Sequence, residues 1–376
     1  MADALRAILV GCGSLSQRGI LPHLAQPDAR ECIQLVAVVD VVAERARACA
    51  ERFGVLSAFS TLDEALATTA ADLVIVTTPV QHHFALALAA INAGKHVYVQ
   101  KTMTATLAEA DELLAARDRA GVKLAAAPGY ELCTTTAAMR EAVASGELGR
   151  VYNAFSFTWG YITHRDPRPG VRDPLAEIDP TWNFQRGGGG PLPNVTVYGL
   201  QLATSVLGPV RRVTALANRL VTERTWAGRS LPVEIEDNNL LVLEFASGTI
   251  GTAVGSNGRG TAWTPWGGLS LHGDRAALQV TEVHHASGYP LRFEVQGGGK
   301  RREYATALSD QPYLRGEHLR LEEPHVYADI MDLADAVRED RPPRATGEQA
   351  RHVVEIIEQA QLAARTGQTQ AIHSTF

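Results

Sequence analysis

Short apolar runs that alternate with helical segments over the first third of the chain limit its fold more than any other feature. Each run is short enough to be one buried strand, and the runs lie at residues 7–10, 33–39, 72–77, 95–99 and 122–126. Helical segments lie between them, at about 44–53, 81–94 and 106–121. Strands that alternate with helices form βαβ units, so the pattern predicts an α/β fold with a doubly wound parallel sheet.

Beyond about Gly129 the strand candidates become longer and alternate between polar and apolar residues, as in Val151–Trp159. Two further candidates flank Ser247–Gly248, which predicts a hairpin turn. Two helices, at about 324–339 and 347–366, close the chain. We therefore predict a second, α+β domain with a large open and mostly antiparallel sheet. The expected domains are residues 1–128 and 129–376.

The composition excludes several classes of protein. The chain has 35 Lys and Arg against 41 Asp and Glu and no long basic run, so we expect no nucleic-acid partner. No apolar stretch approaches about 18 residues, so we expect no membrane partner. No signal peptide is visible at the N-terminus, which predicts a cytoplasmic protein. The four cysteines match no metal motif, so we expect no metal site.

The first chemical signal is a glycine loop directly after the first predicted strand. Gly11-Cys-Gly13-Ser14-Leu15-Ser16 is a G-x-G-x-x-S form of the dinucleotide fingerprint. Glycines let the backbone approach a pyrophosphate, and the N–H groups of the next helix face its charge. Asp40 ends the second strand, where a carboxylate binds ribose hydroxyls and repels a 2′-phosphate. The loop predicts a cofactor site that favours NAD over NADP.

More candidate cofactor contacts follow the next two strands, at Thr77-Thr78-Pro79 with His83 and at Gln100-Lys101. In a doubly wound sheet, ligands bind outside the carboxyl ends of the strands. Lys101 is also a candidate for catalysis, although a lysine after a strand is often only a solvated surface charge.

A glycine run, Gly187–Gly190, precedes a third group of polar residues. Asn194, Tyr198 and Gln201 are spaced so that they share one face of a helix. The glycines let the backbone pass close to a ligand or to the other domain. A helix whose polar face merely packs on the glycine loop is the alternative interpretation.

In order and spacing, these residues resemble the glucose–fructose oxidoreductase, inositol dehydrogenase and rhizopine-catabolism family (Gfo/Idh/MocA) over nearly the whole chain. Besides Gly11, Gly13 and Asp40, the resemblance rests on Thr78-Pro79 with His83, Ala93-Gly-Lys-His-Val97 leading to Lys101, Ser145-Gly-Glu-Leu-Gly149, Gly188-Gly-Gly-Pro-Leu192 and Arg341-Pro-Pro-Arg344. It implies an N-terminal Rossmann domain, a C-terminal domain with an open sheet, and a nicotinamide cofactor between them. Members oxidise or reduce hydroxyls or ketones of sugars and polyols, and commonly form homodimers or homotetramers.

The chain departs from the family pattern at two places. The Glu-Lys-Pro signature reads Gln100-Lys101-Thr102 here, and the resemblance implies that this lysine contacts the cofactor ribose and the substrate hydroxyl. The Asp and His of the downstream motif are Asn194 and Tyr198. A Tyr at this place occurs in branches of the family, whereas Asn194 can hydrogen-bond a hydroxyl but cannot exchange a proton at neutral pH.

We therefore predict Lys101 and Tyr198 as the catalytic pair, in which Tyr198 exchanges the hydroxyl proton while a hydride passes between substrate and nicotinamide. A free phenol has a pKa of about 10, so the charge of Lys101 should favour the phenolate. His164 is the alternative acid or base. The expected substrate-binding residues are Asn194, Gln201, Tyr130, Trp159, His164 and Trp182.

Two other functions remain open at this point. One is a glycosidase that uses transient oxidation by tightly held NAD, and the other is a non-catalytic NAD-binding sensor or partner protein. Release of NADH during turnover separates a dehydrogenase from the glycosidase. Cofactor binding without any turnover would indicate the sensor.

Overall fold

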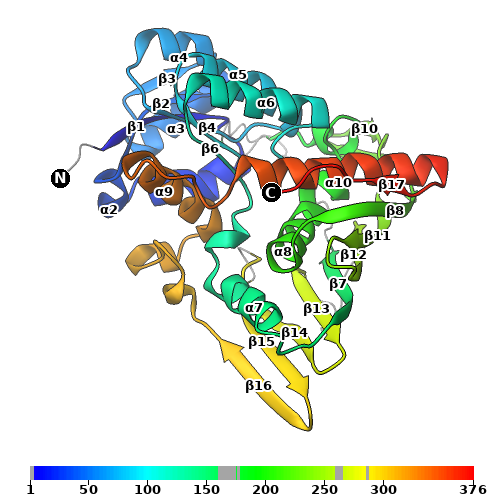
Figure 1. Cartoon of the computed structure of the whole chain (residues 1–376). Coiled ribbons are helices and arrows are strands. Elements are labelled where there is room, and N and C mark those ends of the chain that lie inside the picture. Colours follow the sequence, from blue (N-terminus) through cyan, green and yellow to red (C-terminus); the bar gives the residue numbers. More distant parts are fainter. Residues whose placement is uncertain (1–3, 160–174, 176–177, 259–265, 285–287) are drawn as a thin grey trace.

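The computed structural model describes residues 4–159, 175, 178–258, 266–284 and 288–376, which form two sheets with helices packed around and between them (Figure 1). The first sheet is parallel, with the strand order β3-β2-β1-β4-β5-β6. Its strands are β1 (Leu5–Val10), β2 (Ile33–Val39), β3 (Ser57–Phe59), β4 (Leu73–Val76), β5 (His96–Val99) and β6 (Leu124–Ala126). The order reverses between β1 and β4, so the predicted doubly wound sheet is confirmed.

Helices cover both faces of the first sheet, which fits the apolar residues that predominate in its strands. Along β1, Ala7 and Leu9 enter one core while Ile8 and Val10 enter the other. The covering helices include α3 (Ala43–Phe53), α4 (Leu62–Thr68), α5 (His83–Asn92) and α6 (Leu107–Ala120). A capping box between Thr106 and Glu109 begins α6.

The second sheet is mixed and has nine strands, in the order β16-β15-β14-β13-β7-β12-β11-β8-β17. Only β7 and β12 pair in parallel among these strands, so the mostly antiparallel sheet is confirmed. Its strands are β7 (Val151–Trp159), β8 (Val210–Asn218), β11 (Asn238–Phe245), β12 (Ile250–Ser256), β13 (Gly268–Gly273), β14 (Ala277–Val283), β15 (Pro290–Gly297), β16 (Lys300–Ala305) and β17 (Gln370–Ala371). The hairpin at Ser247–Gly248 is present, although its loop is longer than the predicted two residues because the strands end at Phe245 and resume at Ile250.

Three helices pack against the second sheet, namely α7 (Thr134–Ala144), α8 (Val197–Leu207) and α10 (Gly347–Thr366), and short elements complete the fold. Helix α8 approaches β7 closely, because a Cβ at Gly199 would lie 2.3 Å from the Ser156 hydroxyl oxygen. The short elements are the hairpin of β9 (Glu223–Trp226) and β10 (Arg229–Pro232), α1 (Leu21–Leu24), α2 (Pro27–Arg30), and the short helices η1 (Ser16–Ile20), η2 (Val80–His82), η3 (Tyr130–Leu132), η4 (Thr181–Phe184), η5 (Leu192–Thr196), η6 (Leu308–Asp310) and η7 (Gly316–Leu319).

Helix α9 (Pro324–Arg338) returns from the second domain to the first sheet. Its residues Val326, Ile330 and Leu333 share one core with Leu9 of β1. The division into domains at residues 1–128 and 129–376 therefore stays a prediction. Helix α9 belongs to the second range in the sequence but packs with the first sheet in space.

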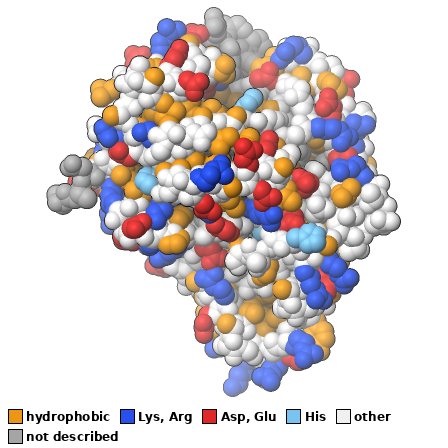
Figure 2. Space-filling model, turned by 45° about the horizontal axis from the view of Figure 1, so that its top comes forward, with side chains coloured by type: hydrophobic (Ala, Val, Ile, Leu, Met, Phe, Trp, Pro, Cys, Tyr) orange, Lys and Arg blue, Asp and Glu red, His pale blue; other side chains and the backbone are white. Residues whose placement is uncertain are grey.

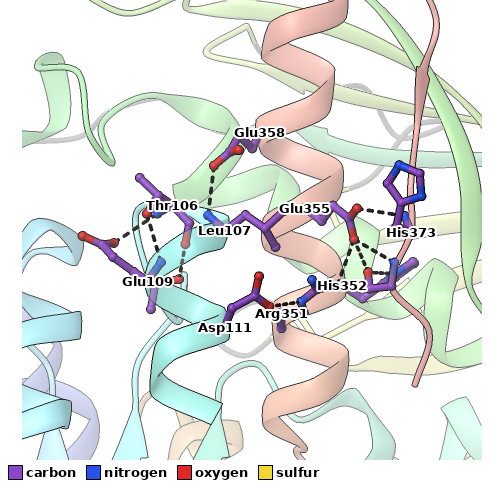
Figure 3. Close-up of polar contacts among 11 residues, drawn as sticks. Thr106, Leu107, Glu109, Asp111, Arg351, His352, Glu355, Glu358 and His373 are labelled. Carbon is purple, nitrogen blue, oxygen red and sulfur yellow. Dashed lines mark hydrogen bonds and ion pairs between the residues drawn. The ribbon is translucent and has the colours of Figure 1, made fainter. Parts of the chain in front are cut away.

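Helix α10 (Gly347–Thr366) joins the two domains along its length (Figure 3). Val354 packs in the core of the first sheet, and Ile356 packs in the core of the second. On the side of α6, Glu358 accepts a hydrogen bond from the Leu107 N–H at 2.9 Å, and Arg351 pairs with Asp111 at 2.7 Å. Opposite faces of one helix thus fix the domains to each other.

Glu355 on α10 holds the C-terminal segment (Figure 3). Its carboxylate accepts hydrogen bonds from the backbone N–H groups of His373 (2.8 Å) and Ser374 (2.9 Å), and it pairs with Arg351 at 3.1 Å. Burial raises the pKa of Glu355, but the hydrogen bonds from Ser374 and His373 outweigh burial and leave it below the ordinary value.

The described surface carries mixed charge. Figure 2 shows acidic and basic side chains interspersed over one face of the molecule. Within the described ranges, we find no helix that is both long and apolar enough to span a bilayer.

We expect Glu355→Ala to lower the Tm by several degrees. The change leaves two N–H groups without their acceptor, and each hydrogen bond to a buried charged group contributes about 1.5–3 kcal/mol. A carboxylate with a lowered folded-state pKa stabilises the fold above its ordinary pKa, and this effect is lost as the pH falls through the folded value. Thermal melts between pH 7 and pH 3 should therefore show the two proteins converging on acidification. The exposed Glu51→Ala is the control, and an equal Tm for Glu355→Ala at pH 7 would contradict the assignment.

Candidate functional site

The glycine loop lies against the end of β4. Gly11 has a φ of 99°, and a Cβ there would lie 3.0 Å from the backbone of Thr77, so this position requires glycine. Ser16, at the third fingerprint position, donates from its hydroxyl to the Gly11 carbonyl at 2.5 Å and lies 2.8 Å from the Thr77 hydroxyl. The serine therefore ties the loop to β4.

The loop retains groups for a bound cofactor. Gly13 has no heavy atom within 4 Å of the place of a Cβ, so open space lies beside this glycine. Ser14 is exposed and Leu15 is half-buried at the start of the following helical turn. After β4, the Thr78 hydroxyl is buried without a hydrogen-bond partner among the described residues, and Pro79 is half-buried next to it. An open glycine and a buried hydroxyl without a partner fit a polar ligand at this edge of the sheet.

Asp40 differs from the free carboxylate that the fingerprint predicts. It accepts hydrogen bonds from the N–H groups of Cys12 (2.8 Å) and Val42 (2.9 Å), and it pairs with Arg45 at 3.1 Å. Only 7% of the residue is exposed. Asp40 thus shapes the glycine loop, and the nearby guanidinium balances part of its charge.

His83 lies beneath this edge instead of on it, contrary to the prediction that it contacts the cofactor. The residue is 1% exposed, and its ring nitrogens lie 2.7 Å from the Thr78 carbonyl oxygen and 2.8 Å from the Thr102 carbonyl oxygen. Burial lowers the pKa of His83 to about 4. Because both nitrogens face backbone, the side chain positions two loops.

Gln100 is also placed differently from the prediction. Its amide nitrogen donates to the Tyr98 hydroxyl at 2.9 Å, and Tyr98 donates to Asp329 of α9 at 3.3 Å. Gln100 is 3% exposed, so its side chain supports the loop from below. Its neighbour Thr102 donates to the Pro193 carbonyl at 2.8 Å, which joins this loop to the second domain.

The predicted pair Lys101 and Tyr198 comes together from the two domains. The Lys101 Nζ lies 5.9 Å from the centroid of the Tyr198 ring. Burial lowers the pKa of Lys101, and the carboxylate of Glu323 opposes that change. Burial raises the pKa of Tyr198, and the charge of Glu323 raises it further. The expected phenolate is therefore wrong for this structure, since the ammonium lies over the ring and Tyr198 stays protonated.

Aromatic rings and one histidine surround Tyr198. Its ring centroid lies 5.1 Å from Trp266, 5.9 Å from His325 and 6.4 Å from Tyr130. Tyr130 donates from its hydroxyl to the Gly288 carbonyl at 3.1 Å, so it contributes a ring to this wall but no free hydroxyl proton.

Asn194 lies outside helix α8, which carries Tyr198 and Gln201, so the predicted single helix does not run through all three residues. Asn194 lies in the π-helical turn η5, whose wider spacing changes the helical register before α8 begins. Both N–H groups of its amide bind backbone, at the carbonyls of Gly188 (3.1 Å) and Gly190 (2.9 Å). Gln201 is 1% exposed, and its amide atoms have no partner among the described residues. Asn194 thus retains only its oxygen for a ligand, and Gln201 lies inside the domain.

The structure describes two of the other predicted substrate residues, Trp159 and Trp182, but not His164. Trp159 ends β7 with its indole N–H buried and without a described partner. Trp182 lies in η4, and its carbonyl accepts a hydrogen bond from Gln81 at 3.4 Å. His164 falls outside the described residues.

Sequence reasoning missed three charged or polar residues beside this site. Arg18 in η1 pairs with Glu323 at 2.5 Å, and Glu323 precedes His325 at the start of α9. Glu323 packs against Gly19, where a Cβ would lie 2.5 Å from the Glu323 Cβ. The signal was a helix beginning at Pro324 with polar residues on both sides. The position of Glu323 near Lys101 results from tertiary packing, which local sequence patterns do not predict.

The side chains gathered here are donors, acceptors and one lysine. No group of three or more His, Cys, Asp or Glu in the described part of the chain could hold a metal ion. The arrangement can bind a dinucleotide along the edge of the first sheet and a polar molecule between Lys101, Tyr198 and Trp266.

Known proteins match the chain over most of its length. D-glucoside 3-dehydrogenase of Escherichia coli (strain K12) is 26% identical over 264 residues, which cover 66% of this chain and 69% of that protein. Myo-inositol 2-dehydrogenase of Thermotoga maritima is 25% identical over 326 residues, 84% of each chain. A structure of levoglucosan dehydrogenase in complex with NADH superimposes with a TM-score of 0.80 at 18% identity, covers 99% of this chain and 100% of that one, and shows the same fold.

Family models match both halves of the chain. Residues 5–127 match the oxidoreductase family with an NAD-binding Rossmann fold, and residues 136–279 match the Gfo/Idh/MocA C-terminal domain. The two matches together take in most of the chain and follow the order of its two sheets. The chain therefore belongs to the Gfo/Idh/MocA family of NAD-binding oxidoreductases.

Proposed function

We propose that this protein is an NAD-dependent dehydrogenase or reductase acting on a hydroxyl or carbonyl carbon of a sugar, glycoside or cyclitol. The observation that carries the proposal is the meeting of Lys101 with Tyr198 where the carboxyl edge of the parallel sheet faces the second domain. The names of the relatives, a glucoside dehydrogenase and an inositol dehydrogenase, support this substrate class.

The first domain supplies the residues that would hold NAD. The glycine loop would face the pyrophosphate and Asp40 the adenosine ribose, because loop N–H groups and a carboxylate suit these two groups. His83 and Gln100 act from below by positioning the loops. NAD, when bound, accepts or returns the hydride. The proposed contacts are Gly11, Gly13, Ser14, Leu15, Asp40, Thr77, Thr78, Pro79 and Lys101.

Lys101 and Tyr198 would act on the reacting oxygen. The protonated Tyr198 can donate a hydrogen bond or a proton to a carbonyl oxygen that becomes an alkoxide, and it receives that proton in the reverse reaction. The Lys101 ammonium would stabilise negative charge on the same oxygen, which is most effective in a buried site. Trp266 offers an aromatic face to the C–H groups of a sugar ring.

We expect Lys101→Met and Tyr198→Phe each to lower kcat by about 10²–10⁴-fold, the usual contribution of acid–base groups. Because both act on one oxygen, the double variant should lose less than the product of the single losses. Activity is followed as NADH formation with myo-inositol, methyl β-D-glucoside, levoglucosan and D-glucose. Lys123→Met, which removes a lysine paired with Asp340 instead, is the control.

Two outcomes would count against this assignment. Near-normal kcat in Tyr198→Phe would show that the tyrosine serves only in packing. His164 would then be the next candidate for the acid or base. Binding of NAD by the wild type without turnover of any substrate would favour a binding protein over an enzyme.

Asp40 should favour NAD over NADP, since its carboxylate repels a 2′-phosphate. We expect Asp40→Ser to narrow the gap between the two affinities, with Arg45 then available as a cation for the phosphate. Titration of intrinsic fluorescence with NADH and NADPH measures both constants. Asp63→Ser on α4 is the control, and equal affinities in the wild type would contradict the role of Asp40.

We also propose that the protein is a cytoplasmic homo-oligomer that pairs through the open face of the second sheet. The four cysteines are free thiols, which supports a reducing compartment. Exposed apolar side chains occupy the sheet face opposite α8, on strands that are otherwise alternately buried. They include Leu216 (75% exposed), Leu240 (44%), Ile250 (41%) and Phe155 (36%). A contiguous apolar face of this kind is typical of an interface between copies.

A charge in this face should prevent assembly. Leu240 lies opposite Leu216 in the sheet, so Leu240→Glu places a carboxylate in the middle of the apolar face. We expect light scattering at micromolar concentration to change from a dimer or tetramer to a monomer. Leu56→Glu, at a residue that is 85% exposed in the first domain, should leave assembly unchanged. A monomeric wild type would exclude this interface.

A further inference from the structure

His325, the second residue of α9, is a buried histidine whose polar atoms are not satisfied. It is 1% exposed, and neither ring nitrogen has a hydrogen-bond partner among the described residues. Leaving a buried donor or acceptor without a partner costs about 1–3 kcal/mol, so native structures rarely keep two such atoms on one ring. A ligand that supplied hydroxyl groups would satisfy them.

The ring lies inside the proposed reactive site. Its centroid is 5.9 Å from that of Tyr198 and 5.8 Å from that of Tyr289. The charge of Lys101 acts on the imidazole and lowers its affinity for a proton. His325 is therefore next to Tyr198 and close enough to Lys101 to be affected by its charge.

Glu323 orients this imidazole. One carboxylate oxygen, Oε1, pairs with Arg18 at 2.5 Å, and the other, Oε2, lies 3.6 Å from Nδ1 of His325. A carboxylate on that side favours the tautomer with its proton on Nδ1. The lone pair of Nε2 is then an acceptor that no described residue uses.

The surroundings keep the imidazole neutral. Burial, together with the charges of Lys101 and Arg18, lowers the pKa of His325 to about 3. The N-terminal end of α9 also disfavours a positive charge at this position. His284 and His23 act in the same direction, and the other titratable groups packed around the ring are Glu323, Tyr198 and Tyr289.

We propose that His325 is a substrate-binding residue, which as a neutral imidazole positioned by Glu323 accepts a hydrogen bond from a polyol hydroxyl next to the one that Tyr198 and Lys101 contact. This inference rests on the proposed function and narrows its substrate class to molecules with neighbouring hydroxyl groups. None of the motifs that carry the family resemblance includes this residue.

The test compares His325→Phe, which removes both polar atoms, with His325→Gln, which keeps a donor and an acceptor. The readout is the affinity of the dead-end complex of enzyme and NADH for a polyol. The polyol is the one of the four substrates above that the wild type turns over. We expect binding to weaken by about 10–100-fold in His325→Phe and by less than about 5-fold in His325→Gln, in line with the loss of one buried hydrogen-bond partner. NADH affinity should stay unchanged in both.

Three further measurements support or overturn the role. Glu323→Gln should weaken polyol binding, because Glu323 positions the ring. The ratio of wild-type to His325→Gln kcat/KM should be constant between pH 6 and pH 9, since the imidazole does not titrate there. His352→Gln is the control and should bind polyol normally. It alters a different buried histidine, on α10, whose Nε2 accepts a hydrogen bond from the backbone N–H of Val210.

Wild-type polyol affinity in His325→Phe would overturn the inference and show that the ring only packs. Loss of one limb of the pH profile in His325→Gln would also overturn it, because His325 would then be an acid or base. A wild type that turns over none of the polyols would contradict the proposed function instead, so the two failures are distinguishable.

Discussion

The imidazole of His83 joins the two loops on which the site depends. Its contacts to the carbonyls of Thr78 and Thr102 prevent the loops after β4 and β5 from moving independently. Thr102 in turn bonds the Pro193 carbonyl, so the same constraint reaches the glycine run and the start of α8. The distance between Lys101 and Tyr198, which stand on different domains, is thus set by buried hydrogen bonds beneath them. Helix α10 repeats the constraint on a larger scale by packing in both cores.

Local patterns predicted most elements because strand and helix periodicity is written in neighbouring residues. Val151–Trp159 is β7 with the same bounds, and Gly347–Thr366 is α10. The packing of α9 was not predictable in this way. Its sequence shows an amphipathic helix and its ends, but which sheet receives the apolar face depends on long-range packing. The chain crosses back to the first sheet there, after every strand of the second sheet except β17 has been formed.

The candidate site was predictable where residues follow strand ends, and less so elsewhere. Parallel strands place Gly11, Thr77 and Lys101 at one edge whatever the details of packing. The helical spacing of Asn194 was misleading, because η5 is a π-helical turn and an even 3.6-residue period does not run from it into α8. Side-chain chemistry was harder still. Whether Tyr198 ionises depends on burial and on Glu323, and neither is visible in the residues around position 198.

The two departures from the family pattern change where the negative charge of the site comes from. Amides stand at Gln100 and Asn194, so neither motif brings a carboxylate to Lys101. A half-buried ammonium still requires a counter-charge, since an uncompensated charge in a low-dielectric site is strongly unfavourable. Glu323 supplies it from the start of α9 and shares it with Arg18 of the glycine-loop helix. The negative charge near Lys101 therefore comes from the start of α9, outside the family motifs. His325 stands two residues after Glu323 and reaches the site on the same helix.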